Sequence, residues 1–533
     1  MAIAEEIFRK KFSSSVINNK TYVIASDGDL MEGISHEAMS LAGHLKLKNL
    51  IVFFDNNKIS IDGSTSLSVS DNYKKRFESY GWSFLEVNGH NEKQISKAIT
   101  KASKSKKPTI ISCKTIIGFG SPNKSGKASS HGSPLGDEEI ALVRKKLKWN
   151  NQPFEVPQEI LDEWRNIGNK GVQLENEWLE TVNKKNPKIK SELNGVNEKL
   201  DLNGLENLIR QEKDKHFESK PSLATRQCSM AAIEKISAFL PELIGGSADL
   251  SGSNNTKTNN SKIINSKNFN GNYIHYGVRE HGMAAVMNGL ALYGGIIPYG
   301  GTFLIFSDYC KPSIRLSALM GLKVIYVFSH DSIGLGEDGP THQPIEQLTG
   351  LRAIPNLNVF RPADINETFE CWEIALKSEN TPSAIALSRQ KVPYINPSNS
   401  KENKCEKGAY VVNLTSHESN VTLVASGTEV ELALKVQDKL KENNIHSKVV
   451  SMPCMELFDK QPEDYRKDIL EENSLIITLE AGSVMSWQKY IKNKGANLGI
   501  DKFGESAPYK EVYKHFKLSE EDITNFIQKK LRE

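Results

Sequence analysis

The chain has 533 residues, more than one hydrophobic core usually holds, so we expect several domains. Its 68 basic and 65 acidic side chains nearly balance, which gives no electrostatic basis for binding nucleic acid. No apolar run approaches the roughly 20 residues of a membrane span, and the first residues, MAIAEEIFRKKF, lack a signal-peptide core. Six scattered cysteines without a CxxC pair argue against a disulfide framework or zinc site and predict a cytoplasmic protein.

The first region of the chain alternates short apolar runs with helical patterns. The runs are TYVIAS (21–26), LIVFFD (50–55), SFLEV (83–87) and TIISCK (109–114), and helical spacing fills stretches such as 31–46 and 91–104. Strands that alternate with helices predict a parallel sheet with helices on both faces. The mainly polar sequence of residues 137–219 then predicts helices.

Strand–helix alternation returns from about 221 to 395, and again after the polar link NPSNSKENKCEKG. The predicted fold class is therefore α/β, with three domains, each built on a mainly parallel sheet flanked by helices. The expected domains are residues 1–150, 220–395 and 396–533, with a helical connector over 151–219.

A polar motif, Ser26-Asp27-Gly28, ends the first predicted strand. Ligands bind at the carboxyl ends of strands in open parallel sheets, and a glycine lets the backbone approach a phosphate. Asn57 and the carbonyl of Ile59 follow the next strand, so oxygen ligands suited to Mg²⁺ or Ca²⁺ could converge there. A simple capped turn beside an asparagine-rich loop is the alternative.

The stretch HDSIGLGEDGPTHQP, residues 330–344, follows a predicted strand and carries two histidines, three acids and three glycines. A buried core has no use for such a loop, so it predicts a functional site. By itself Glu280, in GVREHGM, could simply favour a helix N-terminus. Phe303, Phe306 and Tyr309 fall at helical spacing and indicate either core or a surface for a flat heterocycle.

Four further residues are weak signals alone. His131 lies in SSHGSPLG, Arg226 and Ser229 lie in ATRQCSMAAIE, and Arg389 follows the predicted strand SAIALS. Arg226 is predicted to precede a helix start and Arg389 ends a predicted strand, both natural positions for a phosphate ligand, although a lone arginine is more often in a surface ion pair.

Together these motifs resemble transketolase over essentially all 533 residues, in that family's order. The resemblance rests on SDGDLMEGISHEAMSLAGHLKL, DNNKISIDG, CKTIIGFGSPNK, SHGSPLG, GGSADLSGSN, NYIHYGVREHGM, HDSIGLGEDGPTHQPIEQL, ALSRQ and FGESAP. It implies an enzyme that moves a two-carbon glycolaldehyde unit from a ketose phosphate to an aldose phosphate. Cleavage between C2 and C3 of the ketose leaves a carbanion, and thiamine diphosphate supplies the electron sink.

The resemblance also assigns cofactor residues. Asp27, Asn57 and the Ile59 carbonyl would hold the divalent cation, Mg²⁺ or Ca²⁺, and Gly28 would approach the diphosphate. The other implied cofactor contacts are Glu32, Ile61, His131, Leu250, Glu280, Phe303, Phe306 and Tyr309. Glu280 would hydrogen-bond the pyrimidine ring, a task suited to a carboxyl whose pKa burial has raised.

For the substrate, the resemblance implies that Asp338 and His342 contact donor hydroxyls and that His131 exchanges a proton with a substrate oxygen. The implied sugar-phosphate ligands are Arg226, Ser229, Ser253, His330 and Arg389. It further implies a homodimer with its active sites at the interface, where Glu32 links the two sites.

Two departures from the family pattern matter. The metal motif usually begins with glycine where this chain has Ser26, which is tolerated if its φ is negative. The segment that carries a diphosphate loop and several histidines in relatives has no match here. We expect a short working enzyme, and the alternatives are one half of a split enzyme with a separate N-terminal chain or a non-catalytic dimer that binds the cofactor. A synthase that condenses pyruvate with a triose phosphate would share the cofactor.

Overall fold

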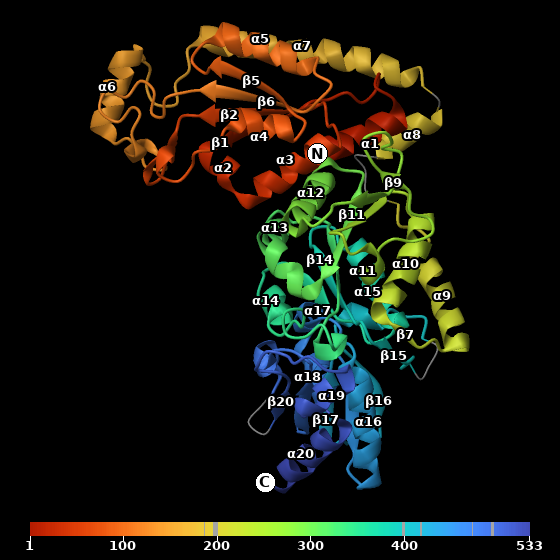
Figure 1. The fold of residues 1–533 in the computed structure, drawn as a ribbon. Helices are drawn as coiled ribbons and strands as arrows, with labels where there is room; N and C mark the ends of the chain where they lie inside the picture. The colour runs from red at the N-terminus through yellow and green to blue at the C-terminus, as the bar shows by residue number, and fades with distance from the viewer. Residues whose placement is uncertain (186, 196–200, 397–399, 416–417, 472, 492–494) are drawn as a thin grey trace. The chain divides into compact units, whose positions relative to one another are not determined.

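The computed structural model describes residues 1–185, 187–195, 201–396, 400–415, 418–471, 473–491 and 495–533 (Figure 1). Its contacts divide the chain into two compact units, and each is described by itself. Unit 1 comprises residues 1–198 with 265–270, and unit 2 comprises residues 199–264 with 271–533. Among the described residues, no helix has both the length and the apolar character needed to cross a membrane.

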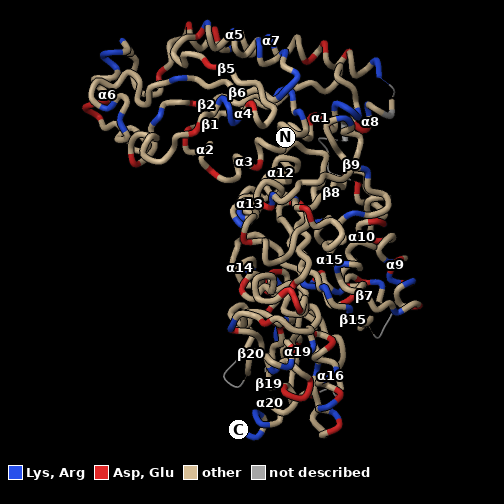
Figure 2. Tube along the Cα trace, in the orientation of Figure 1, with Lys and Arg blue, Asp and Glu red and all other residues tan. Residues whose placement is uncertain are grey.

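Unit 1 is built on a four-stranded parallel sheet in the order β1-β2-β6-β5. All four strands were predicted as β-branched and aromatic runs. Helices α4 and α5 pack on β5, and Figure 2 shows both positive and negative residues along α7. The elements of unit 1 are α1 (Ala2–Phe12), β1 (Thr21–Ser26), α2 (Asp27–Met31), α3 (Gly33–His44), β2 (Leu50–Asn56), β3 (Ile59–Ser60), β4 (Gly63–Ser64), η1 (Thr65–Leu67), α4 (Tyr73–Ser79), β5 (Ser83–Asn88), α5 (Glu92–Ser103), β6 (Thr109–Lys114), η2 (Ala128–Ser130), α6 (Asp137–Leu147), α7 (Gln158–Asn183) and α8 (Pro187–Gly195).

Unit 2 begins with helix α9 and a seven-stranded parallel sheet in the order β13-β14-β12-β11-β8-β10-β9. Helices α10 and α15 pack together, as do α12 and α13. The elements of this part are α9 (Leu205–Ser219), β7 (Leu223–Ala224), α10 (Thr225–Phe239), β8 (Leu243–Ser247), α11 (Ser251–Asn254), β9 (Ile263–Ile264), β10 (Tyr273–His275), α12 (Glu280–Tyr293), β11 (Ile297–Phe303), η3 (Leu304–Phe306), α13 (Ser307–Leu319), β12 (Ile325–Ser329), η4 (Ile333–Leu335), α14 (Gln347–Arg352), β13 (Asn358–Phe360), α15 (Ile365–Lys377), β14 (Ser383–Leu387) and β15 (Lys391–Val392).

The C-terminal part of unit 2 holds a five-stranded sheet in the order β16-β18-β17-β19-β20. Its first strand is antiparallel to β18 and the other pairs are parallel, so the predicted mainly parallel α/β class is confirmed. The elements are η5 (Lys404–Lys407), β16 (Tyr410–Leu414), β17 (Val421–Ala425), α16 (Glu429–Glu442), β18 (Ser447–Ser451), α17 (Met455–Asp459), α18 (Glu463–Leu470), β19 (Leu475–Leu479), η6 (Val484–Tyr490), β20 (Ala496–Leu498), α19 (Tyr509–His515) and α20 (Glu520–Arg532).

Buried charges join the two sheets of unit 2. Arg361, after β13, is fully buried and its Nε donates to Asp331 Oδ2 at 2.9 Å, while its Nη1 pairs with Glu429 on α16. Arg352 binds Glu480 through two hydrogen bonds of 2.7 and 2.8 Å. Breaking such a pair would leave an uncompensated buried charge, so these contacts fix the start of loop 330–344 against the C-terminal part.

Candidate active site

In unit 1 the predicted cation ligands gather where β1 and β2 end. The two strands run parallel with Ser26 opposite Asp55, so the residues that follow each strand meet at one edge of the sheet. Asp27 is buried, and its Oδ2 accepts from the backbone N–H of Lys58 at 3.0 Å. Ser26 has φ −100°, so serine meets no strain at this turn.

The loop after β2 carries the other two predicted ligands, the amide of Asn57 and the carbonyl of Ile59. Asn57 Oδ1 accepts from the backbone N–H of Ile59 at 2.9 Å, which leaves this oxygen a second lone pair. Burial raises the pKa of the Asp27 carboxyl, and the backbone N–H groups of Lys58 and Asn57 oppose that shift. One carboxylate, one amide oxygen and one carbonyl fit the oxygen chemistry that Mg²⁺ and Ca²⁺ prefer.

The other predicted residues of unit 1 are exposed. A Cβ placed on Gly28 would meet no protein atom within 4 Å, so the space above its backbone is open. Glu32, Ile61 and His131 are all exposed, Ile61 by 76%. No hydrogen bond or ion pair between the described residues joins these side chains to Asp27 or Asn57.

In unit 2, Glu280 is the first residue of α12, as predicted, and its side chain is almost fully buried. Thr302 Oγ1, on β11, donates to Glu280 Oε1 at 3.3 Å. A carboxyl held between a helix N-terminus and a buried strand has a fixed direction, which the proton-holding role inferred from the family requires.

The aromatic residues correct one prediction. Phe303, Phe306 and Tyr309 were expected on one helix face, but Phe303 ends strand β11, Phe306 ends η3 and only Tyr309 lies in helix α13. The strand was missed because IPYGGTF contains a proline and two glycines, which weaken strand patterns. The rings nevertheless form a row, with centroids 5.7 Å apart for Phe303–Phe306 and 6.0 Å apart for Phe306–Tyr309.

Both histidines of loop 330–344 join this aromatic row. The ring of His330 stacks on Phe303 with centroids 3.8 Å apart, and the ring of His342 lies 5.6 Å from that of Phe306. His330 has φ +60°, a conformation that costs energy for a residue with a Cβ, and Ser329 Oγ fixes its Nδ1 at 2.9 Å. Ser329 in turn donates to Asn254 Oδ1 at 2.7 Å, a partner that sequence reasoning missed because 75 residues separate the two.

Positive charge concentrates around His330. Burial lowers the pKa of the His330 imidazole to about 3, and Arg226, Arg389 and His342 add to that effect. Arg226 Nη1 donates to the carbonyl of Ser253 at 2.6 Å, while its buried Nε has no partner among the described residues. Two arginines that both act electrostatically on His330, one with an unused donor, are suited to an anion with several oxygens.

Two predicted substrate residues need comment. Arg226 lies inside the first turn of α10 rather than before it. Ser229, on the same helix, is fully buried and its Oγ accepts from the indole N–H of Trp372 at 2.9 Å. We therefore do not retain Ser229 as a substrate ligand, because it points into the core.

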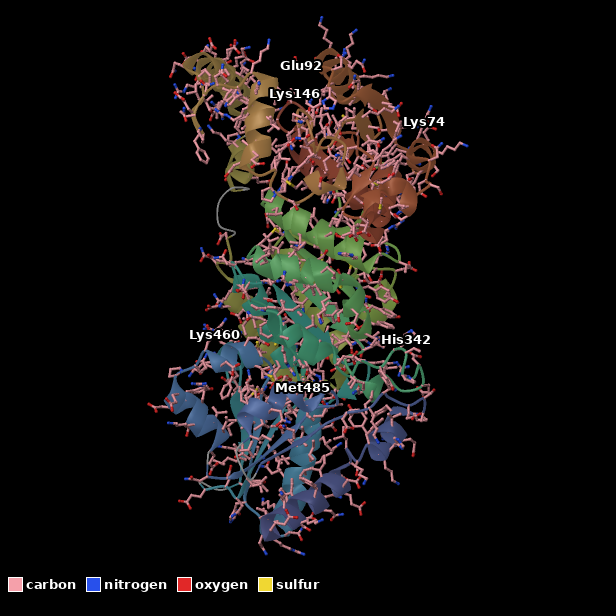
Figure 3. The ribbon with its side chains drawn as sticks, turned by 90° about the vertical axis from the view of Figure 1, so that its left-hand side faces the viewer. Lys74, Glu92, Lys146, His342, Lys460 and Met485 are labelled. Atoms are coloured by element: carbon pink, nitrogen blue, oxygen red, sulfur yellow. The ribbon has the colours of Figure 1, made fainter. Side chains whose placement is uncertain are left out.

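Asp338 and His342 lie toward the tip of loop 330–344. Asp338 is exposed and His342 is half-buried, and Figure 3 labels His342 on the loop at the edge of this unit. His342 Nδ1 lies 2.9 Å from Thr341 Oγ1. The described part of unit 2 thus brings together Glu280, the aromatic row, His330, His342 and the arginine pair.

Three family models match the chain. They are described as the transketolase thiamine diphosphate binding domain over residues 1–202, the transketolase pyrimidine binding domain over residues 221–394 and the transketolase-like C-terminal domain over residues 408–519. Transketolase of Sinorhizobium medicae is 47% identical over 524 residues, a match that covers 98% of this chain and 75% of that protein. The chain belongs to the transketolase family.

Solved structures agree with this assignment. Transketolase from Leishmania mexicana superposes with a TM-score of 0.93 at 37% identity, covering 100% of this chain and 79% of that one. A Pichia stipitis transketolase, solved in complex with sedoheptulose-7-phosphate, gives a TM-score of 0.92 at 38% identity over 100% of this chain and 79% of that one. The predicted family, fold class and enzyme class, a transferase that binds thiamine diphosphate, are confirmed.

The comparisons also bear on the split-enzyme alternative. In the Sinorhizobium medicae relative the matched region lies inside one longer chain. The comparisons therefore give no support to a separate N-terminal polypeptide as a partner.

Proposed function

We propose that this transketolase binds its sugar-phosphate substrates in unit 2, with the phosphate on Arg226, Arg389 and His330 and the donor hydroxyls on Asp338 and His342. The observation that carries the proposal is the cationic cluster around His330, next to the aromatic row and Glu280. Sedoheptulose-7-phosphate, the ligand of the Pichia stipitis relative, has the phosphate that such a cluster would recognise. Ser253 supports the cluster through its carbonyl, which accepts from Arg226.

The cofactor assignment rests on the fit of the residues described above. Asp27, Asn57 and the Ile59 carbonyl would hold Mg²⁺ or Ca²⁺, and the open space over Gly28 would admit the diphosphate. Phe303, Phe306 and Tyr309 would hold the aminopyrimidine, with Ile61 and Leu250 as apolar contacts and Glu32 linking the two sites of a dimer. When bound, thiamine diphosphate supplies the electron sink for cleavage between C2 and C3 of the ketose.

The chain's own groups then handle protons and orientation. Glu280, aimed by Thr302 and the start of α12, would hold a proton at its carboxyl against the aminopyrimidine. The imidazole of His330 stays neutral at physiological pH, so the positive charge that faces the phosphate would come from Arg226 and Arg389. His131 would exchange a proton with a substrate oxygen.

Three further assignments belong to the proposal. We propose a homodimer with active sites at its interface, which light scattering would test. We keep the domain division at 1–150, 151–219, 220–395 and 396–533. All six cysteines are buried and free, which supports a reducing compartment such as the cytoplasm.

Substrate choice tests the proposal. The protein is supplied with thiamine diphosphate, Mg²⁺ and an aldose phosphate acceptor, and hydroxypyruvate is compared with pyruvate as donor. We expect carbon dioxide release and two-carbon transfer from hydroxypyruvate and no condensation of pyruvate. Efficient use of pyruvate with a triose phosphate would instead establish a synthase.

A further inference from the structure

We infer that residues 504–509, in the C-terminal part of unit 2, position loop 330–344 for the donor substrate. These residues include GESAP of the FGESAP motif, to which the reaction has so far given no role. The inference rests on the proposed function, since it takes Asp338 and His342 as donor contacts.

Loop 330–344 is anchored at both ends and open at its tip. Ile333 and Ile345 are buried in one apolar cluster with Ala481, Ile500, Val512 and Leu518 of the C-terminal part. The backbone N–H of Ser483 donates to the carbonyl of Ile345 at 2.8 Å. Between these anchors Glu337, Asp338 and Thr341 are exposed, so the geometry of the tip depends on a small number of nearby contacts.

Residues 504–509 supply those contacts. Gln343 is buried, and its Nε2 donates both to the carbonyl of Gly336 at 3.0 Å and to the carbonyl of Glu505 at 2.9 Å. Ser506 Oγ donates to the carbonyl of Glu337 at 2.6 Å. Gln343 of the loop and Ser506 of the C-terminal segment therefore each donate a hydrogen bond that joins the loop to the segment. These bonds involve loop residues on both sides of Asp338 in the sequence.

The approach is close on both sides, so a side chain at either glycine would make its neighbour shift. A Cβ on Gly504 would lie 1.6 Å from Gln343 Oε1, and a Cβ on Gly339 would lie 3.2 Å from Ser506 Cβ. Gly336 and Gly339 have φ of +85° and +76°, which side chains rarely adopt. The tip that carries Asp338 is thus shaped against this segment.

If residues 504–509 position the loop, substitutions in them should lower kcat/KM for the donor substrate. A shift of about 1 Å in a group that orients the substrate can cost roughly 100-fold in rate. Gly504→Ala displaces the Gln343 amide, and we expect kcat/KM for the donor to fall about 10- to 30-fold, mainly through a higher KM. Ser506→Ala removes one exposed hydrogen bond, and a fall of about 3- to 10-fold follows from the usual value of such a bond.

The experiment measures activity and loop order together in the protein supplied with thiamine diphosphate and Mg²⁺. Donor kcat and KM, cofactor affinity, and amide hydrogen exchange of residues 336–343 are compared for both variants. Ser506→Thr keeps the hydroxyl and should restore both properties. Lys502→Ala is the matched control, because Lys502 is exposed and its side chain has no hydrogen bond or ion pair among the described residues.

We expect faster exchange of residues 336–343, a higher donor KM and cofactor affinity within twofold of the unaltered protein. Exchange and kcat/KM that match Lys502→Ala would overturn the inference. Faster exchange with unchanged kinetics would also overturn it, because the segment would then stabilise the loop without positioning it. Lost activity with unchanged exchange would overturn it as well. If the unaltered protein shows no two-carbon transfer, the proposed function itself fails, which is a different pattern from any of these.

Discussion

The candidate site residues of unit 1 and unit 2 differ in how the fold holds them. In unit 2, Glu280, Phe303 and His330 are buried and are fixed by hydrogen bonds or ring contacts from neighbouring elements. In unit 1 only Asp27 is buried, while His131 and Ile61 are exposed. The proposed contacts Glu280, Phe303 and His330 of unit 2 are therefore held by the protein itself, whereas most of the proposed diphosphate contacts of unit 1 are exposed.

The sheets show the same contrast. β1 is an edge strand of unit 1, and its Tyr22 and Ile24 side chains are 52% and 82% exposed. In unit 2, β11, β12 and β14 are buried at every position, as strands of parallel sheets with both faces covered usually are. The backbone at the end of a fully buried strand is held in place by the sheet. The backbone positions of His330 and Arg389 are therefore held more firmly than that of Asn57.

The largest expected effect concerns the pH dependence of stability. It should come from the buried carboxyls that lie between the two sheets of unit 2. Glu367 on α15 is fully buried and accepts from Tyr410 Oη at 2.8 Å and from the backbone N–H of Ala363 at 2.6 Å. Burial, and next the charge of Asp364, raises the pKa of Glu367 to about 8. The folded protein then binds a proton that the unfolded chain releases above roughly pH 4.5.

The contribution of Glu367 to the free energy of unfolding of unit 2 should consequently fall as pH rises from about 5 to 8, by an amount on the order of several kcal/mol. Glu367→Gln should flatten this slope, while Glu521→Gln, at an exposed position, should leave it unchanged. Urea denaturation across that pH range measures the effect. A Glu367→Gln slope equal to that of the unaltered protein would show that this carboxyl is not held protonated.

The next effect concerns the dependence of unit 1 on its cation. Asp27→Asn keeps the shape but removes the charge, and we expect affinity for thiamine diphosphate in Mg²⁺ to fall about 100-fold or more, since even indirect ligand partners cost 10- to 100-fold. Removal of the cation by a chelator should reproduce the loss in the unaltered protein, and added Mg²⁺ should reverse it. Calorimetric titration is the measurement, with exposed Asp62→Asn as control. Cofactor binding at normal affinity in Asp27→Asn would remove this residue from the cation site.

A smaller effect should appear at the cationic cluster of unit 2. Arg226→Ala or Arg389→Ala removes a charge-assisted hydrogen bond to phosphate, so KM for a ketose phosphate should rise about 10- to 100-fold. KM for hydroxypyruvate, which has no phosphate, should stay within twofold. Lys391→Ala, at an exposed position close to Arg389 in sequence, serves as control. Equal losses on both donors would mean that the arginines support the fold of the site rather than bind phosphate.

Much of the fold could be predicted because its strands are β-branched or aromatic runs, as in TYVIAS or LIVFFD. Strand β11 could not, because IPYGGTF has glycines that tertiary packing demands: a Cβ on Gly300 would lie 2.5 Å from the sulfur of Met287. That contact belongs to another element and leaves no local pattern. The helix-face reading of Phe303 to Tyr309 failed for the same reason.

The site divides in the same way. A dense polar motif such as residues 330–344 can be recognised in the sequence, and the structure brings the two histidines of that loop to the aromatic row. The residues that hold these side chains in place cannot be recognised from the sequence in this way. Ser329 donates to Asn254, and Gln343 donates to the carbonyl of Glu505, 162 residues away. Ser229 shows the converse, since its place near Arg226 in sequence gave no sign that a helix would turn it toward Trp372.

In the proposed function Glu280 holds the proton that the reaction needs, and the variant Glu280→Gln probes that role. The variant keeps the size of the side chain but removes its titrating proton. Cofactor binding and two-carbon transfer from hydroxypyruvate are measured side by side, with Glu521→Gln as control. The account predicts thiamine diphosphate affinity within a few-fold of the unaltered protein and turnover lower by about 100-fold or more, the scale of general acid–base catalysis. Near-normal turnover with the cofactor bound would contradict it.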